Sequence, residues 1–419
     1  MLNKLLLLNI GLFFMPSIYA AELNSGDTSW ILTSTALVLF MTLPGLALFY
    51  GGLVRSKNVL SVLMQCFAIA CLISVCWVAY GYSLAFKGDG LFIGNLSAAF
   101  LNGVGRDSLV GGVPETVFIS FQMTFAIITP ALVVGAFAER MKFGAMCIFS
   151  VVWFTLVYLP ACHMVWGGGY LANLGVIDFA GGLVVHATCG IGALVIALYL
   201  GQRNGFMKTP MPPHNRTMVM IGASMLWVGW FGFNGGSVLS ADPGLTSLTL
   251  VTTCLAAAAG GVVAALVSFL KFKNLDLTMF LNGILGGLVG ITAGADQMSP
   301  TDAIVIGVVA GAIIVFAVSL IDRLKLDDPV GAIAVHLVCG VWGTLAVGIF
   351  GNLASKAQFI SQLTGVVSYA IICIISSFAI IYTLKKIVGI RVSEREELEG
   401  LDAHEHGMDA YPDFRLNEH

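Results

Sequence analysis

Apolar runs of about 20 residues recur along almost the whole chain, and short segments rich in Gly, Pro and charged residues separate them. A run of that length is what an α-helix needs to cross the hydrocarbon core of a bilayer. The pattern therefore predicts an all-α polytopic membrane protein. Its eleven transmembrane helices are expected at residues 28–50, 59–85, 115–137, 143–162, 180–200, 217–236, 246–270, 277–294, 302–321, 330–350 and 362–386.

The loops between these helices differ in positive charge. Loops predicted on one side hold eleven Lys and Arg residues, from Arg55 to Lys325, whereas those on the other side hold only Lys87, Arg106 and Lys356. Cytoplasmic loops carry the excess of Lys and Arg in membrane proteins. The bias predicts that the N-terminus lies outside the cell and the C-terminus in the cytoplasm.

Both ends of the chain differ from the apolar middle. Lys4, a short apolar stretch and the small residues before Ala21 predict a signal peptide at residues 1–21, with an uncleaved anchor helix as the alternative. The membrane domain is expected at residues 22–388. Residues 389–419 form an acidic tail, with nine acids between Glu394 and Glu418. A regulatory tail and a merely solvated end both fit this composition.

Composition supports a membrane protein in a lipid bilayer. Hydrophobic residues make up 58% and charged residues 10%, against about 25% charged residues in soluble domains, and the mean hydropathy is +0.93. The net charge of −3 gives no reason to expect nucleic acid binding. The nine cysteines are odd in number and lie in apolar segments, so no disulfide framework is expected.

Two sequence matches reveal an internal repeat. The stretch from Asp178 to Gly190 agrees with that from Asp328 to Gly340 at six of thirteen positions, and Phe49-x-Gly-Gly matches Phe233-x-Gly-Gly. These pairs join the first predicted helix to the sixth and the fifth to the tenth. An odd number of helices per half requires two inverted five-helix halves, followed by one C-terminal helix. Inverted repeats are typical of transporters, whose site lies near the midplane.

The repeat carries two histidines. His186 and His336 each follow an aspartate by eight residues, or about 12 Å of helix. Because Asp178 and Asp328 begin their helices from opposite sides, the two histidines are expected to meet near the midplane. Two unrelated histidines bonded to backbone carbonyls are the alternative. A metal pair is disfavoured because no third ligand is expected at helix spacing. Both aspartates also suit simple helix capping.

Aromatic residues are predicted outside the histidines. Trp166 follows the fourth helix, Phe125 lies in the third, and Phe233 and Ser237 share one face of the sixth. Aromatic faces attract a small cation, and a hydroxyl accepts an N–H bond. Each residue taken singly also fits an interfacial anchor or a packing role.

Several long motifs resemble the Amt/Mep/Rh ammonium transporter family, in its bacterial Amt branch. They are Phe-Tyr50-Gly-Gly-Leu-Val-Arg-Ser-Lys-Asn58, Phe121-Gln-Met-Thr-Phe125, Met164-Val-Trp166-Gly-Gly-Gly, Asp178-Phe-Ala-Gly-Gly-Leu-Val-Val-His186 and Gly-Trp230-Phe-Gly-Phe233-Asn-Gly-Gly-Ser237. The resemblance runs from about residue 27 into the tail, where Gly400-Leu-Asp402 and Tyr411-Pro-Asp-Phe414 also match.

The resemblance implies ammonium or ammonia transport for nitrogen uptake, by a homotrimer in the bacterial inner membrane, without enzyme activity or cofactor. A PII-type signal protein would bind the tail and inner loops at the cytoplasmic face. The implied outer substrate site consists of Trp166, Phe125 and Ser237, supported by Asp178. Phe125 and Phe233 would gate the pore, and His186 and His336 would be the paired pore histidines.

Three other classes compete with transport. The first is an ammonium sensor with little flux that signals through the tail. The second is a histidine-metal membrane enzyme, which is disfavoured because the sequence offers no evident carboxylate or cysteine partner for the histidines. The third is a water or urea channel, which has no need of an aromatic site for a cation.

Overall fold

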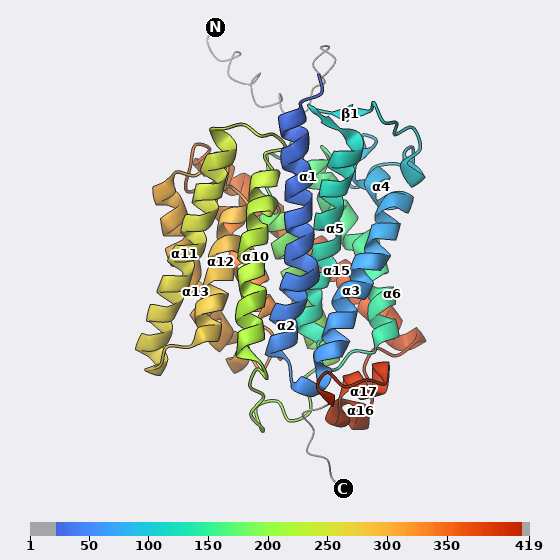
Figure 1. The fold of residues 1–419 in the computed structure, drawn as a ribbon, viewed down its shortest axis with the longest axis vertical. Coiled ribbons are helices and arrows are strands. Elements are labelled where there is room, and N and C mark those ends of the chain that lie inside the picture. Colours follow the sequence, from blue (N-terminus) through green and yellow to red (C-terminus); the bar gives the residue numbers. More distant parts are fainter. Residues whose placement is uncertain (1–21, 413–419) are drawn as a thin grey trace.

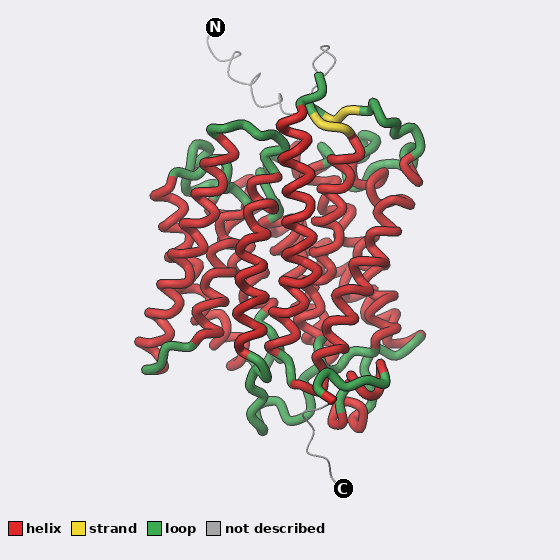
Figure 2. Tube along the Cα trace, viewed as in Figure 1, coloured by secondary structure: helices red, strands yellow, loops and turns green. Residues whose placement is uncertain are grey.

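The computed structural model describes residues 22–412, and the predicted signal peptide at residues 1–21 lies outside this range. The described chain is predominantly helical, and its long helices run side by side from one end of the molecule to the other (Figures 1 and 2). α1 begins at one end of the bundle, and the short helices α16 and α17 lie at the other end. We call the end with α16 and α17 the tail face and the other end the opposite face.

The first half contains two strands and the following helices: α1 (Ser25–Phe40), η1 (Met41–Leu46), α2 (Ala47–Leu53), η2 (Ser56–Asn58), α3 (Val59–Cys76), η3 (Trp77–Gly81), α4 (Tyr82–Phe86), η4 (Ala99–Leu101), α5 (Glu115–Phe137), α6 (Phe143–Trp153), η5 (Phe154–Tyr158), α7 (Leu159–Trp166), α8 (Tyr170–Asn173), η6 (Gly182–Ala187) and α9 (Thr188–Leu200). The strands β1 (Leu109–Val110) and β2 (Val113–Pro114) form an antiparallel hairpin on the opposite face (Figure 2).

The second half consists of α10 (Arg216–Gly236), α11 (Leu245–Phe272), α12 (Leu277–Thr292), α13 (Pro300–Arg323), η7 (Ile333–Val338), α14 (Cys339–Ala346), α15 (Lys356–Ile387), α16 (Glu394–Glu399) and α17 (Leu401–His406). The segments η1, η3, η5, η6 and η7 are π-helical turns that continue directly into α-helices, whereas η2 and η4 are 3₁₀ turns.

Within residues 22–412, nine helical segments are long and apolar enough to span a membrane: Ser25–Leu53, Ser56–Phe86, Glu115–Phe137, Phe143–Asn173, Gly182–Leu200, Arg216–Gly236, Leu245–Phe272, Pro300–Arg323 and Lys356–Ile387. Each coincides with a predicted span. The remaining predicted spans correspond to two shorter apolar helices, Leu277–Thr292 and Ile333–Ala346. That these two also cross the bilayer, giving eleven spans, stays a prediction.

Glycine brings three helices of the second half into close contact. A Cβ atom added at Gly287 of α12 would lie 2.1 Å from the carbonyl oxygen of Ala256 in α11. At Gly311 of α13, the added atom would lie 2.3 Å from the carbonyl oxygen of Gly260, also in α11. Apolar side chains gain little from associating with one another in lipid, so this close backbone packing holds α11, α12 and α13 together.

The C-terminal tail is docked on the tail face. The Asp402 carboxylate accepts hydrogen bonds from the backbone N–H groups of Leu60 and Ser61, at 3.0 and 2.7 Å, in the first turn of α3. Glu397 accepts from Asn204 N–H, and Glu405 accepts from Phe143 N–H. Three acidic side chains of the tail therefore bond three different loop or helix ends. The described part of the tail is not a merely solvated end.

Beneath the tail lies a buried cluster of ion pairs. Arg203 pairs with Glu139 at 2.9 Å and with Asp327 at 2.8 Å, and Arg55 pairs with Glu139 at 2.8 Å. Burial by itself raises the pKa of Glu139, but Arg203 and Arg55 outweigh it and lower that pKa to about 2. The cluster ties together the segments that follow four helices, α2, α5, α9 and α13, below the tail.

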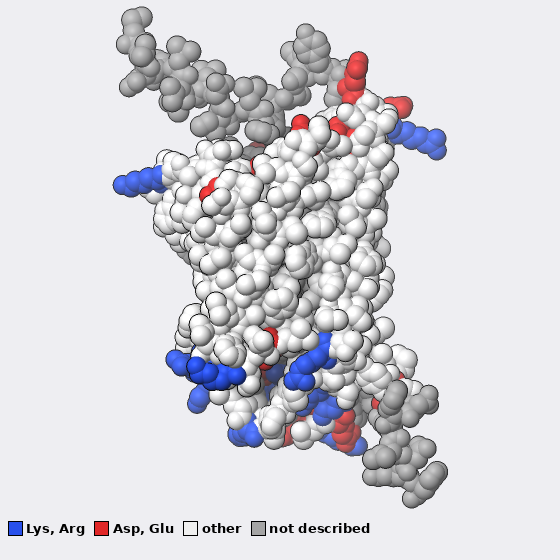
Figure 3. Space-filling view, turned by 60° about the vertical axis from the view of Figure 1, so that its left-hand side comes forward, with Lys and Arg blue, Asp and Glu red and all other residues white. Residues whose placement is uncertain are grey.

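Charge is distributed unevenly over the surface (Figure 3). A broad band without charged residues crosses the middle of the visible face. Most of the Lys and Arg residues on this face lie toward the tail face. Such a band fits the hydrocarbon region of a bilayer.

Candidate functional site

The middle of the molecule contains two matching π-helical turns, η6 and η7. Each follows a glycine with a positive φ, 113° at Gly181 and 77° at Gly331, a conformation that favours glycine. The N–H of His186 bonds to the carbonyl of Gly181, five residues earlier, at 2.9 Å. Each turn thus carries one of the two predicted histidines, at corresponding places in the repeat.

An aspartate caps each turn. The Asp178 carboxylate accepts four backbone N–H bonds of 2.7 to 3.0 Å, from the four consecutive residues Gly181 to Val184. The Asp328 carboxylate accepts two, from Ala332 at 2.9 Å and Ile333 at 2.8 Å. The helix capping expected for both aspartates is therefore present in both.

The two turns cross each other through reciprocal glycines. A Cβ added at Gly190, four residues after His186, would lie 2.3 Å from the backbone nitrogen of Leu337. A Cβ added at Gly340, four residues after His336, would lie 2.8 Å from the backbone nitrogen of Ala187. Each glycine thus leaves room for the residue that follows the histidine of the other turn. This reciprocal contact is what an inverted repeat requires where its halves meet.

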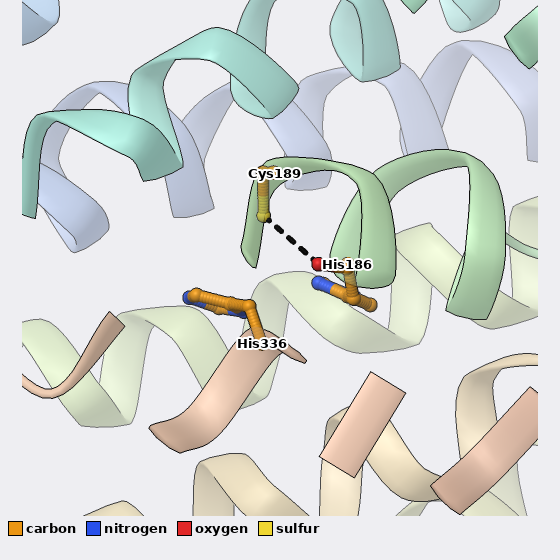
Figure 4. Close-up of side chains that lie close together, drawn as sticks. All are labelled: His186, Cys189 and His336. Atoms are coloured by element: carbon orange, nitrogen blue, oxygen red, sulfur yellow. Dashed lines mark hydrogen bonds between the residues drawn. The ribbon is translucent and has the colours of Figure 1, made fainter. Parts of the chain in front are cut away.

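The crossing brings the rings of the two histidines close together with nearly parallel planes (Figure 4). Their ring centroids are 5.2 Å apart and their planes are inclined by 12°. Both side chains are buried. Three ring nitrogens have no hydrogen-bond partner among residues 22–412: both nitrogens of His186 and the Nδ1 of His336. The alternative of two histidines bonded to backbone carbonyls therefore does not fit His186.

Both rings border a small cavity, which we call the histidine cavity. Its volume of about 10 Å³, counted as the space open to the centre of a water-sized sphere, is close to what one water molecule needs. Apart from the two histidines its walls are largely apolar; they are formed by Met41, Leu46, Phe49, Tyr50, Ile128, Leu132, Leu226, Trp230 and Leu285. A molecule of the size of ammonia would meet imidazole nitrogens and few other polar groups there.

A column of aromatic rings leads from the opposite face to the histidines. Trp166 and Phe125 lie 5.7 Å apart, Phe125 and Phe233 4.4 Å apart, and Phe233 and His186 5.7 Å apart, all between ring centroids. Trp166 is partly exposed, whereas Phe125 and Phe233 are fully buried. The structure thus brings together the four predicted aromatic and histidine positions in one continuous line.

Ser237 bonds to Phe233 of this column, and Asp178 bonds to Trp166 at its outer end. The Ser237 hydroxyl donates to the carbonyl of Phe233 at 2.8 Å, which leaves its oxygen able to accept. The Trp166 indole N–H donates to the backbone carbonyl of Asp178 at 2.7 Å. Asp178 therefore fixes the indole by its main chain, while its carboxylate is occupied by the cap of η6.

Two residues near the histidines were missed by sequence reasoning. Trp230 stacks on His186 at 5.3 Å and donates its indole N–H to Thr292. Its position three residues before Phe233, on the same helix face, was an available signal. The Sγ of Cys189 lies within 4.8 Å of nitrogens of both histidines. The expectation that no third ligand lies at helix spacing is therefore wrong, because Cys189 follows His186 by three residues.

Comparison with known proteins identifies the family. The profile of the Ammonium Transporter Family matches residues 29–411. The chain is 41% identical over 406 residues to an ammonium transporter of Bacillus subtilis, covering 93% of this chain and 100% of that protein. It is 38% identical over 400 residues to the ammonium transporter Amt1 of Archaeoglobus fulgidus, with 93% and 100% coverage.

Solved structures agree. A protein described as a sensor Amt protein superposes with a TM-score of 0.86 at 31% identity, covering 91% of this chain and 98% of that one. Mep2 of Candida albicans gives a TM-score of 0.84 at 33% identity, with 90% and 88% coverage. The chain is a multi-pass membrane protein, and it belongs to the ammonium transporter family, whose members are transporters rather than enzymes.

Proposed function

We propose that the chain takes up ammonium at the outer end of the aromatic column, that the ion gives a proton to solvent water or to the histidine pair, and that ammonia passes through the histidine cavity. The observation that carries this proposal is the pair of imidazoles with unbonded nitrogens, at the inner end of a closed aromatic column. A water or urea channel has no need of this column.

Recruitment rests on Trp166, Phe125 and Ser237. An ammonium ion among these residues meets aromatic faces and a hydroxyl oxygen that can accept one N–H bond. Potassium has a similar charge and size but cannot donate a hydrogen bond. Asp178 supports this site by holding the Trp166 indole in place.

Phe125 and Phe233 form the gate. Their centroids are 4.4 Å apart and both rings are buried, so they close the column between the outer site and His186. A bare ion moved into such an apolar region loses its hydration at a Born cost of tens of kcal/mol. Neutral ammonia does not carry that cost, so deprotonation favours passage.

His186 and His336 then act as one unit. A neutral imidazole has one donor and one acceptor nitrogen, so two facing rings can accept a hydrogen bond from ammonia and relay a proton between them. Both rings are buried, which separates the relay from bulk solvent.

Flux measurements on histidine variants test this proposal. We expect His186→Ala and His336→Ala each to impair ammonium transport or its selectivity over potassium, and the double variant to lose little more, because residues that act together are not additive. Purified variants would be compared in liposomes at matched protein content. His214→Ala is the control, since His214 contacts Val54 and Tyr411 near the tail face, away from the cavity. Wild-type flux and selectivity in both single variants would refute the relay.

We further propose that the chain forms homotrimers in the bacterial inner membrane, with the tail face in the cytoplasm and the N-terminus outside. The charge bias of the loops supports this orientation. A reporter fused after His419 should be active only inside the cell. Residues 22–388 would form the membrane domain. A PII-type signal protein would bind the tail face, and pull-down with the full chain and with a variant lacking residues 393–419 tests this contact.

A sensor is the second candidate. Two observations favour it: the neighbour described as a sensor Amt protein, and the tail bonded to three separate segments of the tail face. Fast ammonium flux by the purified chain would favour transport. Negligible flux, together with ammonium-dependent release of the tail, would favour a sensor.

A further inference from the structure

His186, Cys189 and His336 form a group of three potential metal ligands at the centre of the molecule (Figure 4). One atom from each residue, a ring nitrogen or Sγ, lies within 4.8 Å of the other two. All three side chains are buried. Among the His, Cys, Asp and Glu residues of 22–412, these three form the group of at least three whose donor atoms lie close enough together to hold one ion.

The donor atoms in this group are available for a ligand. Neither nitrogen of His186 and not the Nδ1 of His336 is hydrogen bonded to the described protein. The Cys189 thiol donates a single contact of 3.2 Å to the carbonyl of His186. Buried polar atoms normally have a partner, so three unbonded nitrogens in one place indicate a ligand of some kind.

We propose that these three residues bind one soft monovalent cation, of the Cu(I) or Ag(I) class, through two imidazoles and one thiolate. This inference is independent of the proposed transport function. Cys thiolate selects soft ions such as Cu(I), and imidazole is a good copper ligand. Metal bonds of about 2.0–2.3 Å to nitrogen and sulfur, as in zinc sites, let one ion bridge donors up to about 4.5 Å apart. Only small side-chain movements are therefore needed.

Charge balance favours a monovalent ion. On binding, the S–H bond of Cys189 breaks, a metal–sulfur bond forms, and the proton leaves to the solvent. The site gains the positive charge of the metal ion and loses that of the thiol proton, so it stays neutral. No oxidation or reduction takes place. A divalent ion such as Zn²⁺ would leave a net positive charge in apolar surroundings, which is costly.

The repeat supplies a matched control for Cys189. Cys339 follows His336 by three residues, as Cys189 follows His186, and it is also buried and free. It is not a member of the three-ligand group. A bound ion would occupy the region beside the histidine cavity, so its presence would block passage between the two rings.

Competition for Cu(I) between the full chain and a chromogenic Cu(I) chelator, in detergent and under reducing conditions, tests the site. The wild-type protein and Cys339→Ser should each keep one tight site per chain above the background of the other thiols. Cys189→Ser and Cys189→Ala should weaken that site at least about tenfold, because even losing an outer-shell partner of a metal ligand costs about 10- to 100-fold in affinity. Gel filtration would establish that each variant is folded.

X-ray absorption on the Cu(I)-loaded wild type gives a second measurement. We expect nitrogen and sulfur neighbours together, and the sulfur contribution of the tight site should disappear in Cys189→Ser. Each of three results would overturn the proposal. The tight site could be retained in both Cys189 variants, it could be weakened equally in Cys339→Ser, or the ion could be coordinated by sulfur alone. Because binding is measured without transport, these results do not depend on whether the chain moves ammonium.

Discussion

Replacing Asp178 by Asn tests whether its carboxylate is mainly a cap or mainly a source of negative field. The carboxylate oxygens accept two N–H bonds each, one oxygen from Gly181 and Gly182 and the other from Leu183 and Val184. An amide keeps one accepting oxygen and turns an NH₂ group toward the other two N–H groups. The variant therefore loses two hydrogen bonds to a charged acceptor.

Each such bond is worth about 1.5–3 kcal/mol, so the loss of two predicts about 3–6 kcal/mol of lost stability. Asp328→Asn is the matched control, because there each oxygen accepts only one bond and the amide loses one of two. We expect about half the effect, about 1.5–3 kcal/mol. The loss at Asp178 should also lower flux, because the same loop positions the Trp166 indole and the His186 turn.

The assay is the unfolding free energy of each purified variant in mixed detergent, measured by titration with a denaturing detergent, together with flux at several ammonium concentrations. A cap predicts that Asp178→Asn unfolds more easily than Asp328→Asn. Equal losses in the two variants would refute the hydrogen-bond reasoning. Wild-type stability with weaker ammonium dependence would show that the charge of Asp178 acts by its field.

Three further outcomes are expected. The pKa of Glu139 falls from 4.5 to about 2, which corresponds to about 3 kcal/mol of stability. This stability is present above about pH 4.5 and is lost as the pH falls toward 2. Glu139→Gln should remove both the contribution and its acid dependence in unfolding measurements from pH 3 to 7. Trp166→Leu and Ser237→Ala should each weaken the apparent affinity for ammonium or the selectivity over potassium. The expected loss is that of a partly exposed cation contact, about 0.5–1 kcal/mol. Unchanged transport in both variants would show that the two residues serve only in packing. Asp402→Asn should release the tail, so that limited proteolysis cuts it faster than in the wild type, whereas an unchanged cutting rate would show that the other tail contacts suffice.

Much of the fold follows from the sequence because bilayer thickness sets the length of apolar runs. At most ends the predicted and observed limits of the long helices differ by no more than a few residues, and at 115–137 they coincide. The fourth and last spans are the main exceptions. The helices there extend to Asn173 and begin at Lys356, because further turns continue past the apolar window. The π-helical form of η6 and η7 has no signal in hydropathy, since it arises from the cap and the glycine before each turn.

The candidate site was predictable where one motif holds the residues, and less so where packing brings them together. The sequence match predicts that His186 and His336 occupy corresponding places in inverted halves, and the two rings do lie 5.2 Å apart between centroids. The place of Cys189 beside both rings depends on how the two turns cross, which only the structure shows. The docking of the tail was also hidden, because Asp402 and Glu405 bond main-chain N–H groups, which carry no residue signature.

The reciprocal crossing at Gly190 and Gly340 has a consequence for the direction of movement. The two turns meet at matching glycines, so the centre of the path is more nearly symmetrical than its ends. Any preference for one direction of movement is therefore expected to arise mainly at the ends. The ends do differ, with a partly exposed tryptophan at one and a docked acidic tail at the other. Exchanging features between the ends, rather than altering the centre, is the way to reverse such a preference.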